Sequence, residues 1–300
     1  MLDPERLRIR AAFFRAVRDF FYAQGFTEAD TPVLHPVPIP EANIIPISAG
    51  EVFLQTSPEL CMKRLLAVGC GKIFQICPCF RKEERGRLHL EEFRMLEWYR
   101  LNADYNRLMD DCREFFSFLI NRLSTLLPET DFSDLGGPGG TWQYITVEDA
   151  FARYCPISLN DALQNGSFDL NLVEYLEPNL GKNGPEILYD YPAELASLAK
   201  TKASNPNIAE RFELYVNGVE LANGFSELTD PGEQRARFLA ELEKMPDQRR
   251  KTARIPEKFL TALAEIDAAA GIALGLDRLL MLFMDESHIE RVQTFSPADF

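Results

Sequence analysis

The chain has 300 residues, enough for one large domain or two small ones, and its formal net charge at pH 7 is −14. That acidity disfavours a protein whose main task is to hold nucleic acid through phosphate contacts. The charged opening MLDPERLRIR is unlike a signal peptide, and the sequence has no apolar run of about eighteen residues, so we expect no membrane partner.

The cysteines lack the paired spacing of a zinc site, and only three histidines accompany them. We therefore expect no structural metal and interpret the cysteines as reduced thiols of a cytoplasmic protein. They are Cys61, Cys70, Cys77, Cys79, Cys112 and Cys155.

The first hundred residues predict a helix, an extended segment, a second helix and a hairpin. Aromatic side chains recur at helical spacing over residues 7–24, before Gly25. Five prolines in FTEADTPVLHPVPIPEANIIPI forbid a helix there, and the next helix is expected from Pro58. KIFQICPCFR and EEFRMLEWYRL read as strands joined by the charged loop KEERGRLHL.

The rest of the chain predicts helices around a second hairpin. An amphipathic helix is expected over residues 105–127, and the glycine-rich FSDLGGPGGTWQ reads as a linker that opens a helical insertion, together about 131–185. Asn217-Gly218 lies between two apolar runs, which is typical of a hairpin turn. Charged helices are expected at 231–251 and 256–268, so the fold class is α+β with antiparallel strands.

The segment GIALGLDRLLMLF carries an Asp-Arg pair at the head of an apolar run. This pattern predicts a helix buried on nearly all sides, in which Arg278 needs an anionic partner. That partner is either a carboxylate, of Asp277 or a distant residue, or a phosphate of a ligand. Gly271, Ala273 and Gly275 would let such a ligand approach the backbone closely.

Acidic side chains mark the second hairpin. Glu213 and Glu220 flank its turn, and they are either Mg²⁺ ligands or solvated edge acids. Asn223, Phe225 and Glu227 alternate onto one face, which suits the wall of a polar cavity better than a core.

The loop of the first hairpin carries residues suited to a nucleotide, although a surface hairpin with a charged tip has a similar composition. Arg81 suits a phosphate, Phe93 can stack on a base, and Glu83 can accept from an amino group. His89 closes the loop.

Three acids can converge on one pocket, namely Glu59, Glu97 and Glu227. Such a pocket requires a cationic ligand, whereas the neighbouring arginines require phosphates. The pattern therefore indicates a nucleotide and an amine-bearing substrate side by side.

These segments resemble the three motifs of class II aminoacyl-tRNA synthetases. FTEADTPVL resembles motif 1, FRKEERGRLHLEEFRMLEWY motif 2 and GIALGLDRL motif 3, while TSPEL and ERFELYVNGVELANGFSEL resemble the lysyl-specific variants. The resemblance implies one catalytic domain over residues 1–300, an antiparallel sheet flanked by helices, a homodimer, and no preceding anticodon-binding domain.

MKRLLAVGCGKIFQ and ELANGFSELTD, together with Ala273 in place of a motif 3 glycine, resemble the elongation factor P–(R)-β-lysine ligase family. The family implies that ATP activates (R)-β-lysine or lysine as an adenylate, which passes to a lysine side chain of elongation factor P. Stable tRNA binding is not expected. The alternatives are a truncated lysine–tRNA ligase-like enzyme with another acceptor and a catalytically inactive regulatory paralogue.

The resemblance also assigns roles to residues. Arg81, Glu83 and Arg278 are the catalytic set, and Mg²⁺ is held by Glu213 and Glu220. The ATP-binding residues are Arg81, Glu83, His89, Phe93, Glu213, Leu214, Gly275 and Arg278. The lysine pocket consists of Ser57, Pro58, Glu59, Glu97, Tyr99, Glu220, Asn223, Phe225, Glu227 and Ala273.

The motif 2 loop departs from the family pattern at one point. Leu90-Glu91 stands where the family has Asn-Pro. The asparagine that would contact the nucleotide and the proline that would stiffen the loop are therefore both replaced, while the catalytic arginines and glutamates are all present.

Overall fold

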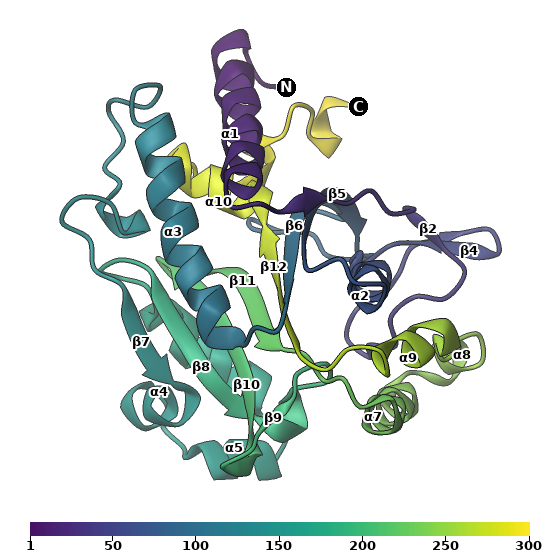
Figure 1. The fold of residues 1–300 in the computed structure, drawn as a ribbon. Helices are drawn as coiled ribbons and strands as arrows, with labels where there is room; N and C mark the ends of the chain where they lie inside the picture. Colours follow the sequence, from purple (N-terminus) through teal and green to yellow (C-terminus); the bar gives the residue numbers. More distant parts are fainter. The chain divides into compact units, whose positions relative to one another are not determined.

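The computed structural model describes residues 1–300, which form two compact units, residues 1–103 with 227–300 and residues 104–226. In the first unit, four strands lie side by side in the order β1-β5-β6-β12, with β1 parallel to β5 and the other pairs antiparallel (Figure 1). The strands of this unit are β1 (Thr27–Glu28), β2 (Leu34–His35), β3 (Ser48–Ala49), β4 (Val52–Leu54), β5 (Lys72–Phe80), β6 (Glu92–Leu101) and β12 (Ala269–Gly275).

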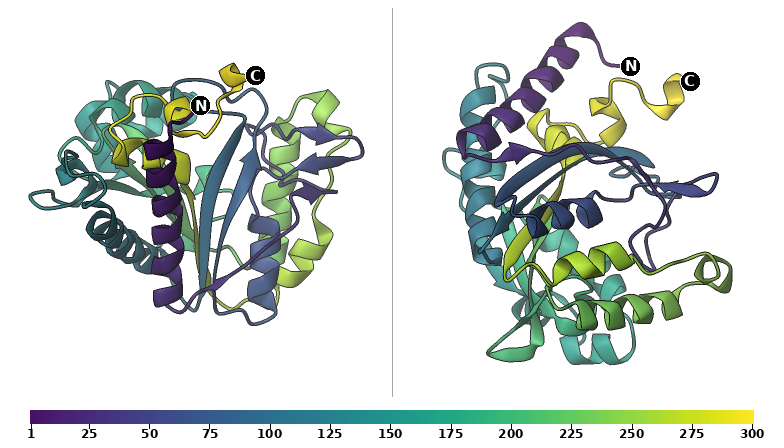
Figure 2. Two further views of the ribbon diagram at one scale, coloured as in Figure 1. Left: turned by 90° about the horizontal axis from the view of Figure 1, so that it is seen from above. Right: turned by 45° about the vertical axis from the view of Figure 1, so that its right-hand side comes forward.

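The helices of the first unit lie where the sequence analysis expects them, except that the segment 231–251 is divided into two helices and the one expected at 256–268 ends at Leu263. They are α1 (Pro4–Ala23), α2 (Glu59–Ala67), α7 (Pro231–Lys244), α8 (Asp247–Arg250), α9 (Glu257–Leu263), α10 (Leu276–Phe283) and two 3-10 turns, Ile289–Val292 and Pro297–Asp299. Asp3 caps the first turn of α1 by accepting from the Arg6 backbone N–H, and Pro4 fits there because that turn needs no donor from it. The chain termini meet where the Met1 ammonium pairs with Asp299 at 2.7 Å (Figure 2).

A buried carboxylate joins three segments of this unit. Asp277, 1% exposed in the first turn of α10, accepts from Arg10 of α1 at 2.9 Å and from the backbone N–H of Arg94 in β6 at 2.7 Å. Arg10 also donates to the Val292 carbonyl at 2.8 Å. The carboxylate at the head of the apolar helix therefore serves the fold, and its cationic partner is Arg10.

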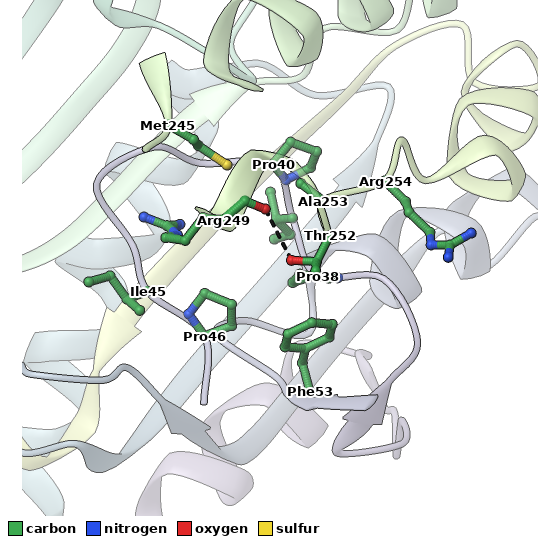
Figure 3. Close-up of a pocket in the computed structure, with 11 residues that line it drawn as sticks. Pro38, Pro40, Ile45, Pro46, Phe53, Met245, Arg249, Thr252, Ala253 and Arg254 are labelled. Atoms are coloured by element: carbon green, nitrogen blue, oxygen red, sulfur yellow. Dashed lines mark hydrogen bonds between the residues drawn. The ribbon is translucent and has the colours of Figure 1, made fainter. Parts of the chain in front are cut away.

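The proline-rich segment follows an irregular path beside α7 and α8, as its prolines require. Arg249 of α8 donates to the carbonyls of Glu41, Ala42 and Ile44, so one guanidinium satisfies backbone that lacks a regular ladder. Beside this contact lies a cavity of about 100 Å³, shown in Figure 3. It is lined by Pro38, Ile39, Pro40, Ile45, Pro46, Phe53, Met245, Arg249, Thr252, Ala253 and Arg254.

The second unit is built on four strands in the order β11-β10-β8-β7, with β9 on β10; β7 and β8 are parallel and the other pairs antiparallel. The strands are β7 (Gln143–Thr146), β8 (Glu186–Pro192), β9 (Thr201–Lys202), β10 (Asn205–Val216) and β11 (Val219–Ser226). The helical elements are α3 (Tyr105–Leu123), α4 (Val147–Tyr154), α5 (Leu159–Gln164), α6 (Phe168–Asn171), a π-helical turn Leu172–Leu176, and 3-10 turns Ser133–Leu135, Glu177–Asn179 and Ala193–Leu195.

The predicted hairpin is confirmed, since β10 and β11 are joined through Asn217 and Gly218, both at positive φ (51° and 76°). Positive φ at both central residues gives the turn the twist of the strands. The glycine-rich segment differs from the expectation of a plain linker. It forms a 3-10 turn with buried Leu135 and leads into strand β7, which the sequence analysis missed. The status of 131–185 as an insertion stays a prediction.

The α+β class with largely antiparallel strands is confirmed, and all six cysteines are unpaired, as expected. None of the helices is both long and apolar enough for a membrane crossing.

Replacing Asp277 by Asn will destabilise the protein by about 3–5 kcal/mol, because it leaves the Arg10 guanidinium buried without a countercharge. Urea denaturation of D277N gives this value. The matched control is Glu257→Gln, which removes an exposed ion pair with Arg235 and will leave the unfolding midpoint unchanged. An unchanged midpoint in D277N would show that the buried pair does not stabilise the unit.

Candidate functional site

Three buried carboxylates surround one buried ammonium in the first unit. Glu59 of α2, Glu97 of β6 and Glu227 are 8%, 1% and 2% exposed. Lys63, 1% exposed, pairs with Glu59 one helical turn earlier and with Oε2 of Glu227 at 2.5 Å. The three predicted acids thus lie together, and the cation among them is a residue that the sequence analysis overlooked. The spacing of Glu59 and Lys63, four residues on a helix, was the available signal.

Hydrogen bonds fix the orientation of Glu97. The Ser57 hydroxyl donates to Oε1 at 2.6 Å, and the Tyr99 hydroxyl donates to Oε2 at 2.7 Å. The Ser57 oxygen also accepts from the backbone N–H of Glu59, at the start of α2 that follows Pro58. Ser57 therefore links the helix to the strand and holds two of the three acids in register.

Gly271 is required by this cluster. It pairs with Tyr99 across β12 and β6, and a Cβ on it would lie 2.2 Å from Tyr99 Cε1 and 2.4 Å from Glu227 Oε1. No side chain can occupy that space. The side chains of Tyr99 and Glu227 therefore make the close approach that the sequence analysis expected of a ligand at Gly271.

Burial changes the charge of the pocket. It raises the pKa of Glu97 to about 8, helped by repulsion from Glu59 and opposed by the Ser57 and Tyr99 hydrogen bonds. Burial also raises the pKa of Glu227 to about 8 against the attraction of Lys63. Burial lowers the pKa of Lys63, but its two carboxylate partners outweigh this and raise it overall. At neutral pH the pocket therefore holds a charged lysine, and Glu97 and Glu227 carry protons.

Arg278 and the motif 2 hairpin meet in the first unit. The Arg278 Nε donates to the Leu88 carbonyl at 3.2 Å, and Nη2 lies 2.6 Å from Nε2 of His89. Burial, and then the Arg278 charge, lowers the pKa of His89, so its neutral ring nitrogen accepts from the guanidinium. Arg81 lies over the Phe93 ring, its Cζ 5.2 Å from the centroid. The structure thus groups two guanidinium ions, an aromatic face and a neutral histidine, a set suited to polyphosphate and base.

Hydrogen bonds of Glu91 stabilise the loop at the point where its sequence departs from the family pattern. Glu91 accepts from the Glu83 backbone N–H at 2.8 Å and from Arg85 at 2.6 Å, and its carbonyl accepts from the Arg81 N–H at 2.9 Å. These bonds hold Glu83 at a φ of 70°, unusual for a residue other than glycine. Leu90 is buried. Glu91 therefore supplies rigidity that a proline would give, a role the sequence analysis did not foresee.

Glu213 is held tightly in the second unit. Its Oε2 accepts from the hydroxyls of Tyr191 at 2.6 Å and Tyr215 at 2.7 Å, and its Oε1 pairs with Arg211 at 2.6 Å. A bulge in β11 brings Glu220 opposite Tyr215 and Asn223 opposite Glu213. Without this bulge, their spacing of three residues would put Glu220 and Asn223 on opposite faces.

The donor chemistry of this face fits Mg²⁺, though the structure gathers no group of three or more metal-binding side chains. Two carboxylates suit an ion that keeps several waters, and burial and the charge of Glu220 both raise the pKa of Glu213. Arg211 and the tyrosines already use much of the Glu213 acceptor capacity. Binding through Glu213 and Glu220 stays a prediction.

The other predicted residues are placed as follows. Asn223 accepts from Arg211 Nε at 3.2 Å, and Phe225 packs against a small alanine cluster. The Leu214 side chain is fully buried, so only its backbone could contact ATP. Gly275 caps α10, and Ala273 pairs with Glu97 across β12 and β6. That the residues of the two units share one cavity stays a prediction.

The class of protein follows from sequence comparison. The model of the class II tRNA synthetases for D, K and N matches residues 4–299, so the chain belongs to this family and has its fold. The resemblance to class II aminoacyl-tRNA synthetases is confirmed.

Within this class, the chain is similar over nearly its whole length to proteins named elongation factor P–(R)-beta-lysine ligase. It is 36% identical to that of Vibrio campbellii, covering 97% of the chain and 95% of the relative. The relatives in Baumannia cicadellinicola and Pectobacterium atrosepticum are also 36% identical, covering 98% and 96% of the chain and 95% and 93% of their own lengths. The chain therefore belongs to the family of these ligases.

The raised pKa of Glu97 predicts how stability depends on pH. Between about 4.5 and 8 the folded protein keeps a proton on Glu97 that the unfolded chain has lost, so this contribution to stability declines as the pH rises through that window. Glu97→Gln is neutral throughout. We expect the unfolding midpoint of wild type to fall relative to E97Q between pH 5 and pH 8 in thermal melts. A difference that does not vary with pH would contradict the assignment.

Proposed function

We propose that this protein activates (R)-β-lysine, or lysine, with ATP and transfers it to a lysine side chain of elongation factor P. The observation that supports this most directly is the enclosed cluster of Glu59, Glu97 and Glu227, found in a chain that matches the named ligases over nearly its whole length. A pocket of carboxylates suits a substrate with two ammonium groups, and the named relatives act on such a compound.

In the first step the substrate carboxylate attacks the α-phosphorus of ATP, forming the aminoacyl-adenylate and releasing pyrophosphate. Arg81 would bind the α-phosphate and stabilise charge that develops there. Glu83 would accept from the adenine amino group, with the ring between Phe93 and Arg278, and Arg278 and His89 would also contact the outer phosphates. The protein supplies no covalent nucleophile in this scheme, and its contribution is positioning and electrostatics.

The lysine pocket would fix the substrate through its ammonium groups, by way of Ser57, Glu59, Glu97, Tyr99, Asn223, Phe225 and Glu227. Mg²⁺ held by Glu213 and Glu220 would neutralise charge on the phosphates. In the second step the ε-amine of the acceptor lysine attacks the adenylate carbonyl, an amide forms, and AMP leaves with the electron pair while the amine loses its proton. We further propose a cytoplasmic homodimer that does not bind tRNA stably.

Incubation with elongation factor P, ATP, Mg²⁺ and (R)-β-lysine will add one lysyl unit to the acceptor, measured by intact-mass spectrometry. We expect less product with α-lysine. Arg81→Ala will slow the reaction by about 10²–10³-fold, the range for losing a group that stabilises transition-state charge. Its matched control is Arg113→Ala, on the exposed side of α3, which will react at the wild-type rate.

Two other outcomes would change the assignment. AMP formation without a mass gain would retain the adenylation and point to another acceptor, as in a truncated lysine–tRNA ligase-like enzyme. An inactive paralogue would form no AMP and need not be stabilised by ATP, whereas a ligand at 100 times its dissociation constant adds about 2.7 kcal/mol.

The methyl group of Ala273 is expected to favour the β-amino acid. This residue stands opposite Glu97 in the sheet, so its side chain lies beside the amine pocket, the site formed by Glu59, Glu97 and Glu227. Ala273→Gly will shift the ratio of kcat/KM values toward α-lysine by roughly 10-fold, since one methyl in a pocket changes discrimination by about 1–3 kcal/mol. Pyrophosphate exchange with each amino acid measures this ratio, and an unchanged ratio would contradict the role of the methyl group.

A further inference from the structure

The amine pocket contains a cation of its own. Lys63 enters it from α2, is 1% exposed, and bonds to carboxylates on two different segments, Glu59 in its own helix and Glu227 before α7. Its ammonium also lies 5.8 Å from the centroid of the Phe259 ring in α9. A pocket whose sole purpose was to attract cations would gain nothing from a fixed positive charge at its centre.

The count of charges explains the arrangement. Three carboxyl groups and one ammonium make up this cluster, so when all of them are ionised two negative charges remain after Lys63 is counted. A lysine isomer activated at its carboxyl group carries two ammonium groups and no carboxylate. Its charge therefore equals the charge that the pocket leaves uncompensated once Lys63 is counted.

We propose that Lys63 is a positioning residue that fixes Glu59 and Glu227 and sets the pocket charge to accept two ammonium groups. The inference rests on the proposed function, because it concerns the substrate of that same site. Lys63 does not touch the reacting atoms in this scheme. It acts through the carboxylates, holding them in place before the substrate arrives, which lowers the cost of ordering them on binding.

The titratable groups around Lys63 couple the binding of a ligand to the release of protons. Glu59 pairs with it from α2 and Glu227 from the segment before α7, and its charge acts on Glu97 of β6, which accepts from Tyr99. Glu97 and Glu227, each with a pKa of about 8, carry protons at pH 7. A ligand with two ammonium groups would release both protons, and a ligand with one would release one.

The first test uses the wild-type protein. Calorimetric titration at pH 7, in two buffers of different ionisation enthalpy, counts the protons released on binding. We expect about two for (R)-β-lysine and about one for 3-aminohexanoic acid, which lacks the terminal amine. Equal counts for the two ligands would overturn the inference. No binding of either lysine isomer, in a protein that still binds ATP, would overturn the proposed function and the inference with it.

The second test replaces Lys63 by Met, which keeps its length and removes its charge. We expect the KM for (R)-β-lysine in pyrophosphate exchange to rise at least tenfold and the KM for ATP to stay within twofold. Without the cation, Glu227 holds its proton to higher pH, so the pH midpoint of kcat/KM will move upward. Lys63→Arg, which keeps the charge, will restore the wild-type midpoint while binding less tightly.

The control is Lys258→Met on the exposed side of α9, which makes the same chemical change away from the pocket and will match wild type. A folded K63M with wild-type KM values and pH midpoint would show that Lys63 is only a structural ion pair and overturn the inference. In that case adenylation by wild type would continue, so the proposed function would stand. If K63M does not fold, the pH midpoint of K63R and the proton counts decide.

Discussion

The first unit depends on one buried carboxylate. Asp277 binds the Arg10 side chain and the Arg94 backbone at once, so the position of α10 is fixed relative to α1 and β6. Its neighbour Arg278 then has a defined direction, toward Leu88 and His89 at the end of the motif 2 loop. The two adjacent residues at the start of α10 therefore have different roles. Asp277 holds the helix, and Arg278 extends from it to the loop that carries Arg81.

The buried acids of the first unit differ in how their charges are compensated. Asp277 has Arg10, and Glu59 and Glu227 have Lys63. Glu97 accepts from the hydroxyls of Ser57 and Tyr99, and burial opposes its charge. At neutral pH Glu97 keeps its proton, and an ammonium group brought beside it by a ligand would favour the ionised form, which is a physical basis for selecting an amine.

Much of the fold followed from local patterns in the sequence. The helix before Gly25, the strands around the charged loop and the Asn217-Gly218 turn were foreseen because each has a strong local signal. The three pocket acids were foreseen from strand alternation and a helix start. Strand β7 was missed because it is short and directly follows a glycine-rich stretch that is typical of a linker. Lys63 was missed because its role depends on Glu227, 164 positions further along the chain, and no local pattern encodes that contact.

The Leu90-Glu91 segment shows that the motif 2 loop can be held rigid although its sequence departs from the family pattern. A proline restricts the loop by removing backbone freedom, whereas Glu91 restricts it by bonding the Glu83 N–H and the Arg85 guanidinium. The lost asparagine removes a possible ligand contact, but Leu90 gains burial in exchange. The Glu91 bonds are sensitive to charge, since hydrogen bonds from Arg85 and the Glu83 N–H lower the pKa of Glu91. Rigidity in this loop is therefore electrostatic and salt-dependent, unlike the covalent restriction of a proline ring.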